Sequence, residues 1–158
     1  MPFARSVNRD VSGPSEVGMT ESYEIRLSFF DGDSETVCVT RLAADCYRLD
    51  ETPIFNEEEP VYFGDILELE PQADGTHRFK RVVEHAPLHH YNWMVPEFFV
   101  ESPQYGEFCN AVAKASGTWE RVMGGLLLVH VPLNSGFDTE QELDRCIAAA
   151  QGVMQKRY

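Results

Sequence analysis

The sequence predicts an α+β protein: an N-terminal antiparallel curved sheet or small barrel, followed by a ferredoxin-like β-α-β-β-α unit. Two observations carry this prediction. Apolar residues alternate with polar ones in short segments over the first half of the chain, which is the period of half-buried strands. Helical spacing of apolar residues appears only after residue 100, where it alternates with further strand patterns.

Strand patterns begin after residue 21. Residues 1–21 are rich in Ser, Gly and Pro and contain no apolar run, which predicts a flexible tail without a secretory signal. Alternation at residues 23–29 and a β-branched run at 36–42 predict a hairpin around the turn at 31–34. Short extended pieces are expected at 46–49 and 54–55. A second hairpin, of 62–70 and 77–85, turns at Asp74-Gly75.

The second half has the order strand, helix, strand, strand, helix. A strand is predicted over residues 91–100, with Pro96 requiring an edge or bulge. Ser102-Pro103 then provides N-cap and N1 residues, and Gly117 is the expected C′ glycine of that helix. Two strands, 118–123 and 126–131, flank Gly124-Gly125, and Thr139 with Glu142 predicts the capping box of the last helix. The last strand of a ferredoxin-like unit is missing or replaced.

These elements predict three segments: a tail at 1–21, an antiparallel β subdomain at 22–86 and a ferredoxin-like subdomain at 87–158. The two subdomains can equally form one compact domain, since a chain of 158 residues buries enough surface for a single core. The four cysteines form no C-x-x-C pair, and without an export signal they are expected to be reduced thiols in the cytoplasm.

The formal charge of −13 is unevenly distributed. Residues 1–86 contain 18 acidic and 8 basic side chains, whereas residues 87–158 contain 8 and 5. Such acidity argues against binding nucleic acid or an anionic membrane surface, both of which select clustered Lys and Arg. The acidic stretch, defined here as eight side chains in the first half, is either a solvated face or a docking surface for a basic partner: Asp50, Glu51, Glu57, Glu58, Glu59, Asp65, Glu68 and Glu70.

Two strand motifs resemble an uncharacterised bacterial family, a domain of unknown function. They are the run 61–68, in which Gly64-Asp65 precedes two apolar residues and Glu68, and the run 79–84, Phe-Lys-Arg-Val-Val-Glu. The resemblance covers the chain from about residue 23 and implies the same fold in a bacterial cytosol, with no activity attached. Where that family has a Ser-Gly-His segment, this chain has His85 to His90 instead.

One group of residues could form a ligand site: Asp65, Arg81, Glu84 and His89. Gly64 lets the backbone approach a ligand, and Arg81 could hold Asp65 as an ion pair. In the competing structural interpretation, Asp65 caps a turn and Arg81 neutralises Glu68 or Glu70 across the hairpin. We expect no metal, because no histidine and cysteine spacing matches a zinc site, and no cofactor, because no phosphate-binding loop is present.

The chain is therefore expected to be a non-catalytic protein-interaction module, of the kind to which immunity proteins and antitoxins belong. Its expected partner is a basic protein, bound through the acidic first half around Glu57, Glu58 and Glu59. The alternative function is small-ligand binding or hydrolysis near Asp65, Arg81 and His89. The sequence is compatible with a monomer or with a homodimer formed through the open edge of the ferredoxin-like sheet.

Overall fold

The computed structural model describes residues 6–8, 21–30, 32–54 and 60–156, and it divides the chain into two compact units. One unit, the barrel unit, comprises Gly13–Ala86. The other, the helical unit, combines Met1–Ser12 with Pro87–Tyr158. Each unit has its own hydrophobic core. The α+β class predicted from the sequence is confirmed.

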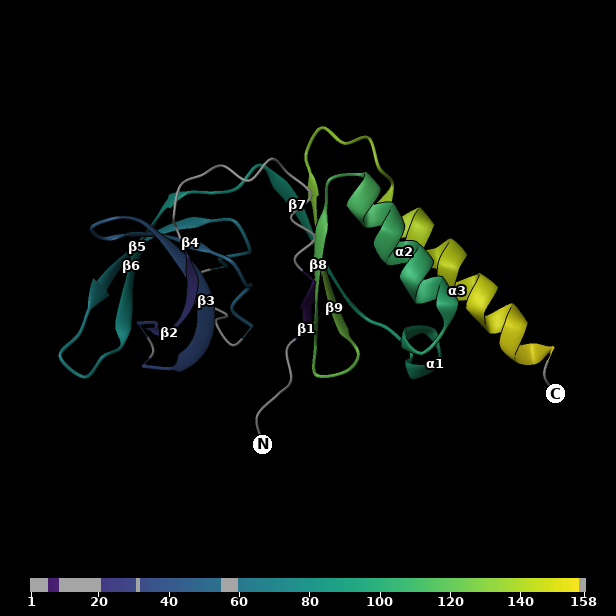
Figure 1. Cartoon of the computed structure of the whole chain (residues 1–158), viewed down its shortest axis with the longest axis horizontal. Helices are drawn as coiled ribbons and strands as arrows, with labels where there is room; N and C mark the ends of the chain where they lie inside the picture. Colours follow the sequence, from purple (N-terminus) through teal and green to yellow (C-terminus); the bar gives the residue numbers. More distant parts are fainter. Residues whose placement is uncertain (1–5, 9–20, 31, 55–59, 157–158) are drawn as a thin grey trace. The chain divides into compact units, whose positions relative to one another are not determined.

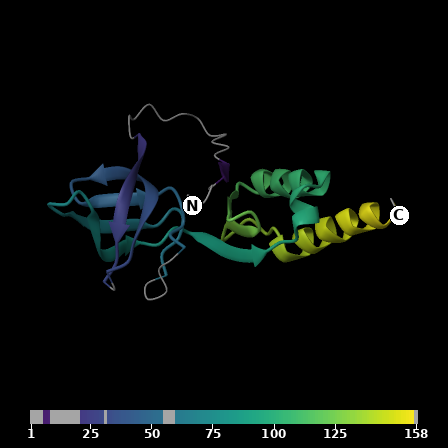
Figure 2. The same cartoon turned by 90° about the horizontal axis from the view of Figure 1, so that it is seen from below.

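The barrel unit is a five-stranded meander closed on itself (Figures 1 and 2). Its strands are β2 (Ser22–Ser28), β3 (Ser34–Ala43), β4 (Cys46–Leu49), β5 (Ile66–Pro71) and β6 (His77–Glu84). Successive strands are antiparallel, and a short parallel pairing of β2 with β6 closes the barrel. Alternating side chains fill the interior, with Leu27, Val37, Val39, Leu49 and Leu67 fully buried. Closure leaves no long open edge among the five described strands of this unit.

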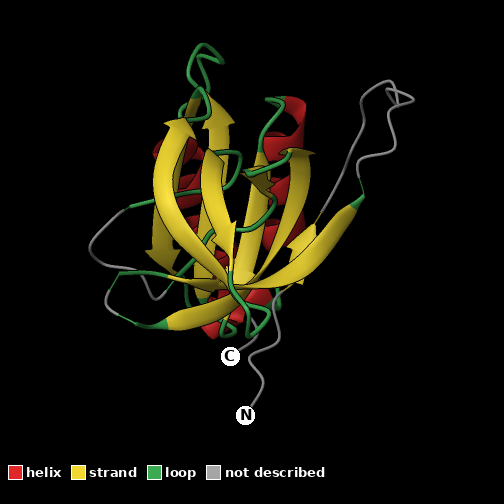
Figure 3. Ribbon diagram, turned by 90° about the vertical axis from the view of Figure 1, so that its left-hand side faces the viewer, coloured by secondary structure: helices red, strands yellow, loops and turns green. Residues whose placement is uncertain are grey.

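The helical unit contains the ferredoxin-like order predicted from the sequence. Its elements are β7 (Leu88–Met94), α1 (Glu97–Val100), α2 (Pro103–Lys114), β8 (Thr118–Val122), β9 (Leu126–Pro132) and α3 (Thr139–Gln155). Strand β9 lies between β7 and β8 and is antiparallel to both. The helices cover one face of this sheet (Figure 3), where they bury Phe99, Phe108, Val112, Leu127 and Val129.

The fourth strand of this sheet comes from the segment expected to be a tail. Strand β1 (Ser6–Asn8) pairs antiparallel with β8, at the edge opposite β7. A ferredoxin-like unit would place its last strand beside β7. A strand of three residues is too short to show a hydrophobic period, so the composition of the segment predicted a tail. Apart from residues 6–8 and Glu21, the predicted tail at residues 1–21 lies outside the described residues.

The predicted strand over residues 91–100 is a strand followed by a helical turn. Strand β7 ends at Met94, and Pro96, at φ −65° and ψ 147°, is the N-cap of α1. The hydrophobicity of Phe98 and Phe99 predicted an internal strand, whereas Phe99 is buried as a residue of α1 in the core of the helical unit. A short apolar run does not distinguish a helix from a strand. Here Pro96 follows the end of the strand and does not form a β-bulge within it.

Two predicted caps are displaced by one residue. The N-cap of α3 is Asp138, whose carboxylate accepts the backbone N–H of Gln141, in place of the expected Thr139–Glu142 pair. At the end of α2 the left-handed residue is Ser116, at φ +62°, and not Gly117. Gly117 is required for another reason: a Cβ there would lie 2.8 Å from the carbonyl oxygen of His130. The glycine therefore lets the end of α2 approach β9.

No helix among the described residues is long and apolar enough to cross a membrane.

Candidate functional site

Asp65 is a buried hydrogen-bond acceptor that fixes the loop before β5. Its side chain is 0% exposed, and its Oδ2 accepts the backbone N–H of Tyr62 at 3.0 Å. Its Oδ1 accepts the N–H of Ala86 at 2.8 Å, and the His85 Nδ1 lies 3.1 Å from Oδ2. These contacts join the two ends of the β5–β6 hairpin. Asp65 thus does the turn-capping work that one interpretation of the sequence assigned to it.

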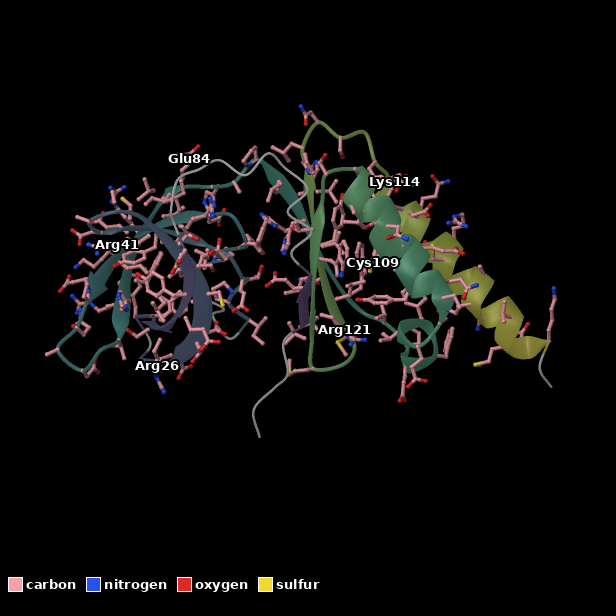
Figure 4. The ribbon with its side chains drawn as sticks, in the orientation of Figure 1. Arg26, Arg41, Glu84, Cys109, Lys114 and Arg121 are labelled. Atoms are coloured by element: carbon pink, nitrogen blue, oxygen red, sulfur yellow. The ribbon has the colours of Figure 1, made fainter. Side chains whose placement is uncertain are left out.

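The other three residues of the predicted ligand group are Arg81, Glu84 and His89. Arg81, on β6, is opposite Glu68 in the β5–β6 pairing and forms an ion pair with it. Glu84 is exposed at the end of β6, labelled in Figure 4, and His89 is exposed on β7 in the other unit. Ligand binding by this group stays a prediction. The Arg81–Glu68 ion pair is the cross-strand contact expected if Arg81 has a structural role.

Most described members of the acidic stretch are engaged within the barrel unit. Asp50 accepts hydrogen bonds from Ser22, Thr40 and Arg48, and the Glu51 carboxylate accepts the N–H of Cys38. Glu70 pairs with Lys80 and Arg78, and these contacts hold the pKa of its carboxyl below the usual value. The three remaining members, Glu57, Glu58 and Glu59, lie outside the described residues. A count of charges in the sequence therefore overstates the acidity that the described barrel surface offers to a partner.

A row of ionisable side chains crosses the sheet of the helical unit. His90 on β7 is directly opposite His130 on β9, with their Nδ1 atoms 2.8 Å apart. The Nε2 of His130 lies 2.7 Å from Oε2 of Glu120 on β8, and both of these side chains are fully buried. The row follows from the sheet register, which places the three residues on neighbouring strands of one face.

The chemistry of this row is the sharing of protons. When His130 donates its Nε2–H to the Glu120 carboxylate, one proton lies between the two facing Nδ1 atoms, because only one of them can donate to the other. Both ring nitrogens of His130 are thus within hydrogen-bond distance of a partner in the sheet. His89 and His90 point to opposite faces, and the parts of the chain described contain no group of three or more His, Cys, Asp or Glu side chains able to hold a metal ion.

A cavity of about 560 Å³ lies between α1 and the β8–β9 hairpin in the helical unit. We call it the charged cavity, because carboxylates and a guanidinium line it together with apolar side chains and two glycines: Val95, Glu97, Val100, Glu101, Arg121 and Gly124-Gly125. Its size falls within the range of cavities that enclose a small molecule or a protein side chain.

Arg121 lies on β8 and extends from the sheet toward α2 (Figure 4). Its Cζ is 5.7 Å from the centre of the Tyr105 ring. Among the described ion pairs none includes Arg121, so the aromatic ring is its principal partner there. Burial, together with the neighbouring Cys109 thiol, raises the pKa of Tyr105, which is therefore neutral at physiological pH.

Glu97 and Glu101 are the acidic half of the cavity. Glu97 is in the first turn of α1 and Glu101 is its C-cap; both are exposed, and no described ion pair or side-chain hydrogen bond includes either of them. No signal in the sequence marks this cavity, because the sequence predicts a strand over residues 91–100. A strand would have carried Glu97 and Glu101 along a sheet and not around a helical turn.

Comparison with known proteins gives one fold relative and no functional one. No protein-family model matches the chain, and no curated protein matches it. A solved structure of a hypothetical protein from Neisseria gonorrhoeae matches with a TM-score of 0.52 and 17% sequence identity; the match covers 84% of this chain and 89% of that one. At this identity the likeness shows the fold alone, and it is consistent with the resemblance to an uncharacterised family.

Proposed function

We propose that the chain is a non-catalytic protein-interaction module that docks a basic partner at the charged cavity. This is the class to which small acidic inhibitors such as immunity proteins and antitoxins belong. The observation that carries the proposal is the pair Glu97 and Glu101, two exposed carboxylates without described partners on the wall of one cavity. Charge complementarity favours a Lys or Arg side chain as the group that enters.

The walls of the charged cavity suit a long basic side chain. Val95 and Val100 offer apolar surface to the methylene stem, while the carboxylates meet the charged end. With Arg121, the formal charge of the three charged residues that line the cavity is −1, and the Arg121 guanidinium can donate hydrogen bonds to carbonyl oxygens of a partner. An ion pair in a partly enclosed cavity is screened less by salt than one on an open surface.

The proposed docking surface differs from the one expected from sequence. The acidic stretch is mostly engaged inside the barrel unit, so the described carboxylates available to a partner at a cavity are in the helical unit. The alternative function, a small-ligand or hydrolytic site near Asp65, Arg81 and His89, has weaker support, because Asp65 and Arg81 are each engaged in other contacts. The same proposal includes a cytoplasmic location, which the four free cysteines support.

The test is affinity capture from a native lysate with matched charge variants. The full chain is compared with Glu97→Gln/Glu101→Gln and with Glu140→Gln/Asp144→Asn, which removes the same charge from exposed positions on α3. We expect one basic protein to be retained by the chain and by the α3 variant, and to be lost from the cavity variant. Its retention should also fall between about 50 mM and about 500 mM salt. Equal loss from both variants, or retention by all three, contradicts the proposal.

A further inference from the structure

A second, smaller cavity adjoins the charged cavity and shares one wall with it. It measures about 260 Å³ and lies between α1, the start of α2 and the last turns of α3. We call it the apolar cavity, and its lining includes Phe98, Glu101, Pro103, Gln104, Val153 and Met154. Glu101 is among the residues that line both cavities.

Exposed apolar surface characterises the second cavity. Val153 is 44% exposed and Met154 is 42% exposed, although most large apolar side chains of the helices face the sheet. Methionine adapts its shape to different apolar partners, which suits it to a binding surface. An apolar side chain entering here would remove this surface from water.

We infer that the two cavities together bind one extended peptide segment with a basic residue at one position and a large apolar residue two positions away. This inference rests on the proposed function and names the partner's recognised sequence. In an extended chain, side chains two positions apart project to the same side and are roughly 6.6 Å apart. The basic side chain enters the charged cavity, and the apolar one enters the apolar cavity.

The test uses capped synthetic peptides and the full chain labelled with nitrogen-15. The reference peptide has the order glycine, lysine, glycine, leucine, glycine. In three companion peptides, serine replaces the leucine, glutamine replaces the lysine, or the leucine is moved next to the lysine. Amide resonances of Gly124 and Gly125 report on the charged cavity, and those of Gln104, Val153 and Met154 report on the apolar cavity.

We expect the reference peptide to shift both sets of resonances and to bind about fivefold to tenfold more tightly than the serine and rearranged peptides. Met154→Gln should abolish that advantage, whereas Leu133→Gln, which changes another exposed apolar residue of the same unit, should preserve it.

The failures can be distinguished from one another. If the lysine peptides shift only Gly124 and Gly125, with equal affinity for leucine and serine, the two-cavity inference is overturned and the proposed function stands. If the leucine peptide lacking lysine binds as tightly as the reference, the apolar cavity acts alone and the paired recognition is overturned. If no peptide shifts either set, the inference and the proposed docking site fall together.

Discussion

The guanidinium of Arg121 lies over the ring of Tyr105, and Tyr105 in turn packs edge-on against Phe99 of α1. The β8 strand, α2 and the short helix α1 are thereby joined at the charged cavity. This contact orients Arg121, the cation among the residues that line the cavity, while Glu97 and Glu101 remain exposed.

Removal of the Asp65 carboxylate should destabilise the protein strongly. Asp65→Ala leaves the backbone N–H groups of Tyr62 and Ala86 without their buried acceptor, and we expect a loss of about 2–4 kcal/mol in the free energy of unfolding. Urea unfolding of the full chain measures it. Glu84→Ala, at an exposed position, is the control and should change stability by less than about 0.5 kcal/mol. An equal effect of the two substitutions would refute this role for Asp65.

The Glu120–His130 contact should show strong coupling in a double-mutant cycle. Each single change, Glu120→Gln or His130→Phe, removes a charge-assisted hydrogen bond and leaves its partner buried, at about 1.5–3 kcal/mol. The double variant should therefore be less destabilised than the sum of the singles. Urea unfolding of the four proteins gives the coupling free energy. Additive effects would show that the two side chains do not interact.

Stability should decrease with acid through His77. Burial, and secondarily the charge of Arg41, holds the pKa of His77 below its usual value in the folded protein, and its Nδ1 is buried without a described partner. As the pH falls, His77 therefore takes up its proton at a higher pH in the unfolded chain than in the folded protein. His77 favours folding above about pH 6.5, and this contribution to the free energy of unfolding is lost as the pH falls toward the pKa of the folded state. His77→Gln should lack this dependence. The comparison is the free energy of unfolding of both proteins from neutral to mildly acidic pH, and parallel curves would contradict the prediction.

Cys109 should be alkylated more slowly than the half-buried Cys38 and Cys46. Burial raises the pKa of the Cys109 thiol to about 11. The Cys109 side chain extends from α2 into the core between this helix and the sheet (Figure 4). Iodoacetamide reacts with thiolates, so at mildly alkaline pH the half-buried Cys38 and Cys46 should be modified first. Mass spectrometry of digested samples taken over time identifies the order. Early modification of Cys109 in the folded chain would show that the α2–sheet core opens readily.

The sequence predicted the class, the order of the elements and the boundary of the hairpins because alternation and turn residues are local signals. Strand β1 was missed because three residues carry no period, and their place is set by pairing with β8, more than a hundred positions away. Pro96 could be recognised as a break, but its effect on residues 97–100 depends on packing of Phe99 beneath the helices.

The site was harder to predict than the fold. Asp50 and Glu51 look like surface acids in the sequence, yet strand pairing brings hydroxyl and backbone donors to them. Arg121 and Glu97 are 24 positions apart, and only the return of β8 toward α1 puts them on one cavity wall. Charge is a property of composition, whereas charge available to a partner is a property of the folded surface.

The most direct test of the proposed docking site is a titration of the labelled full chain with N-acetyl-lysine-N-methylamide, followed by amide resonances. Norleucine and glutamate analogues of the same compound are the controls. We predict that the lysine compound alone shifts Gly124 and Gly125, and that Glu97→Gln/Glu101→Gln abolishes the shift. A shift produced by the glutamate compound in place of the lysine one would show that Arg121 determines what the cavity binds, and would contradict a basic partner at this site.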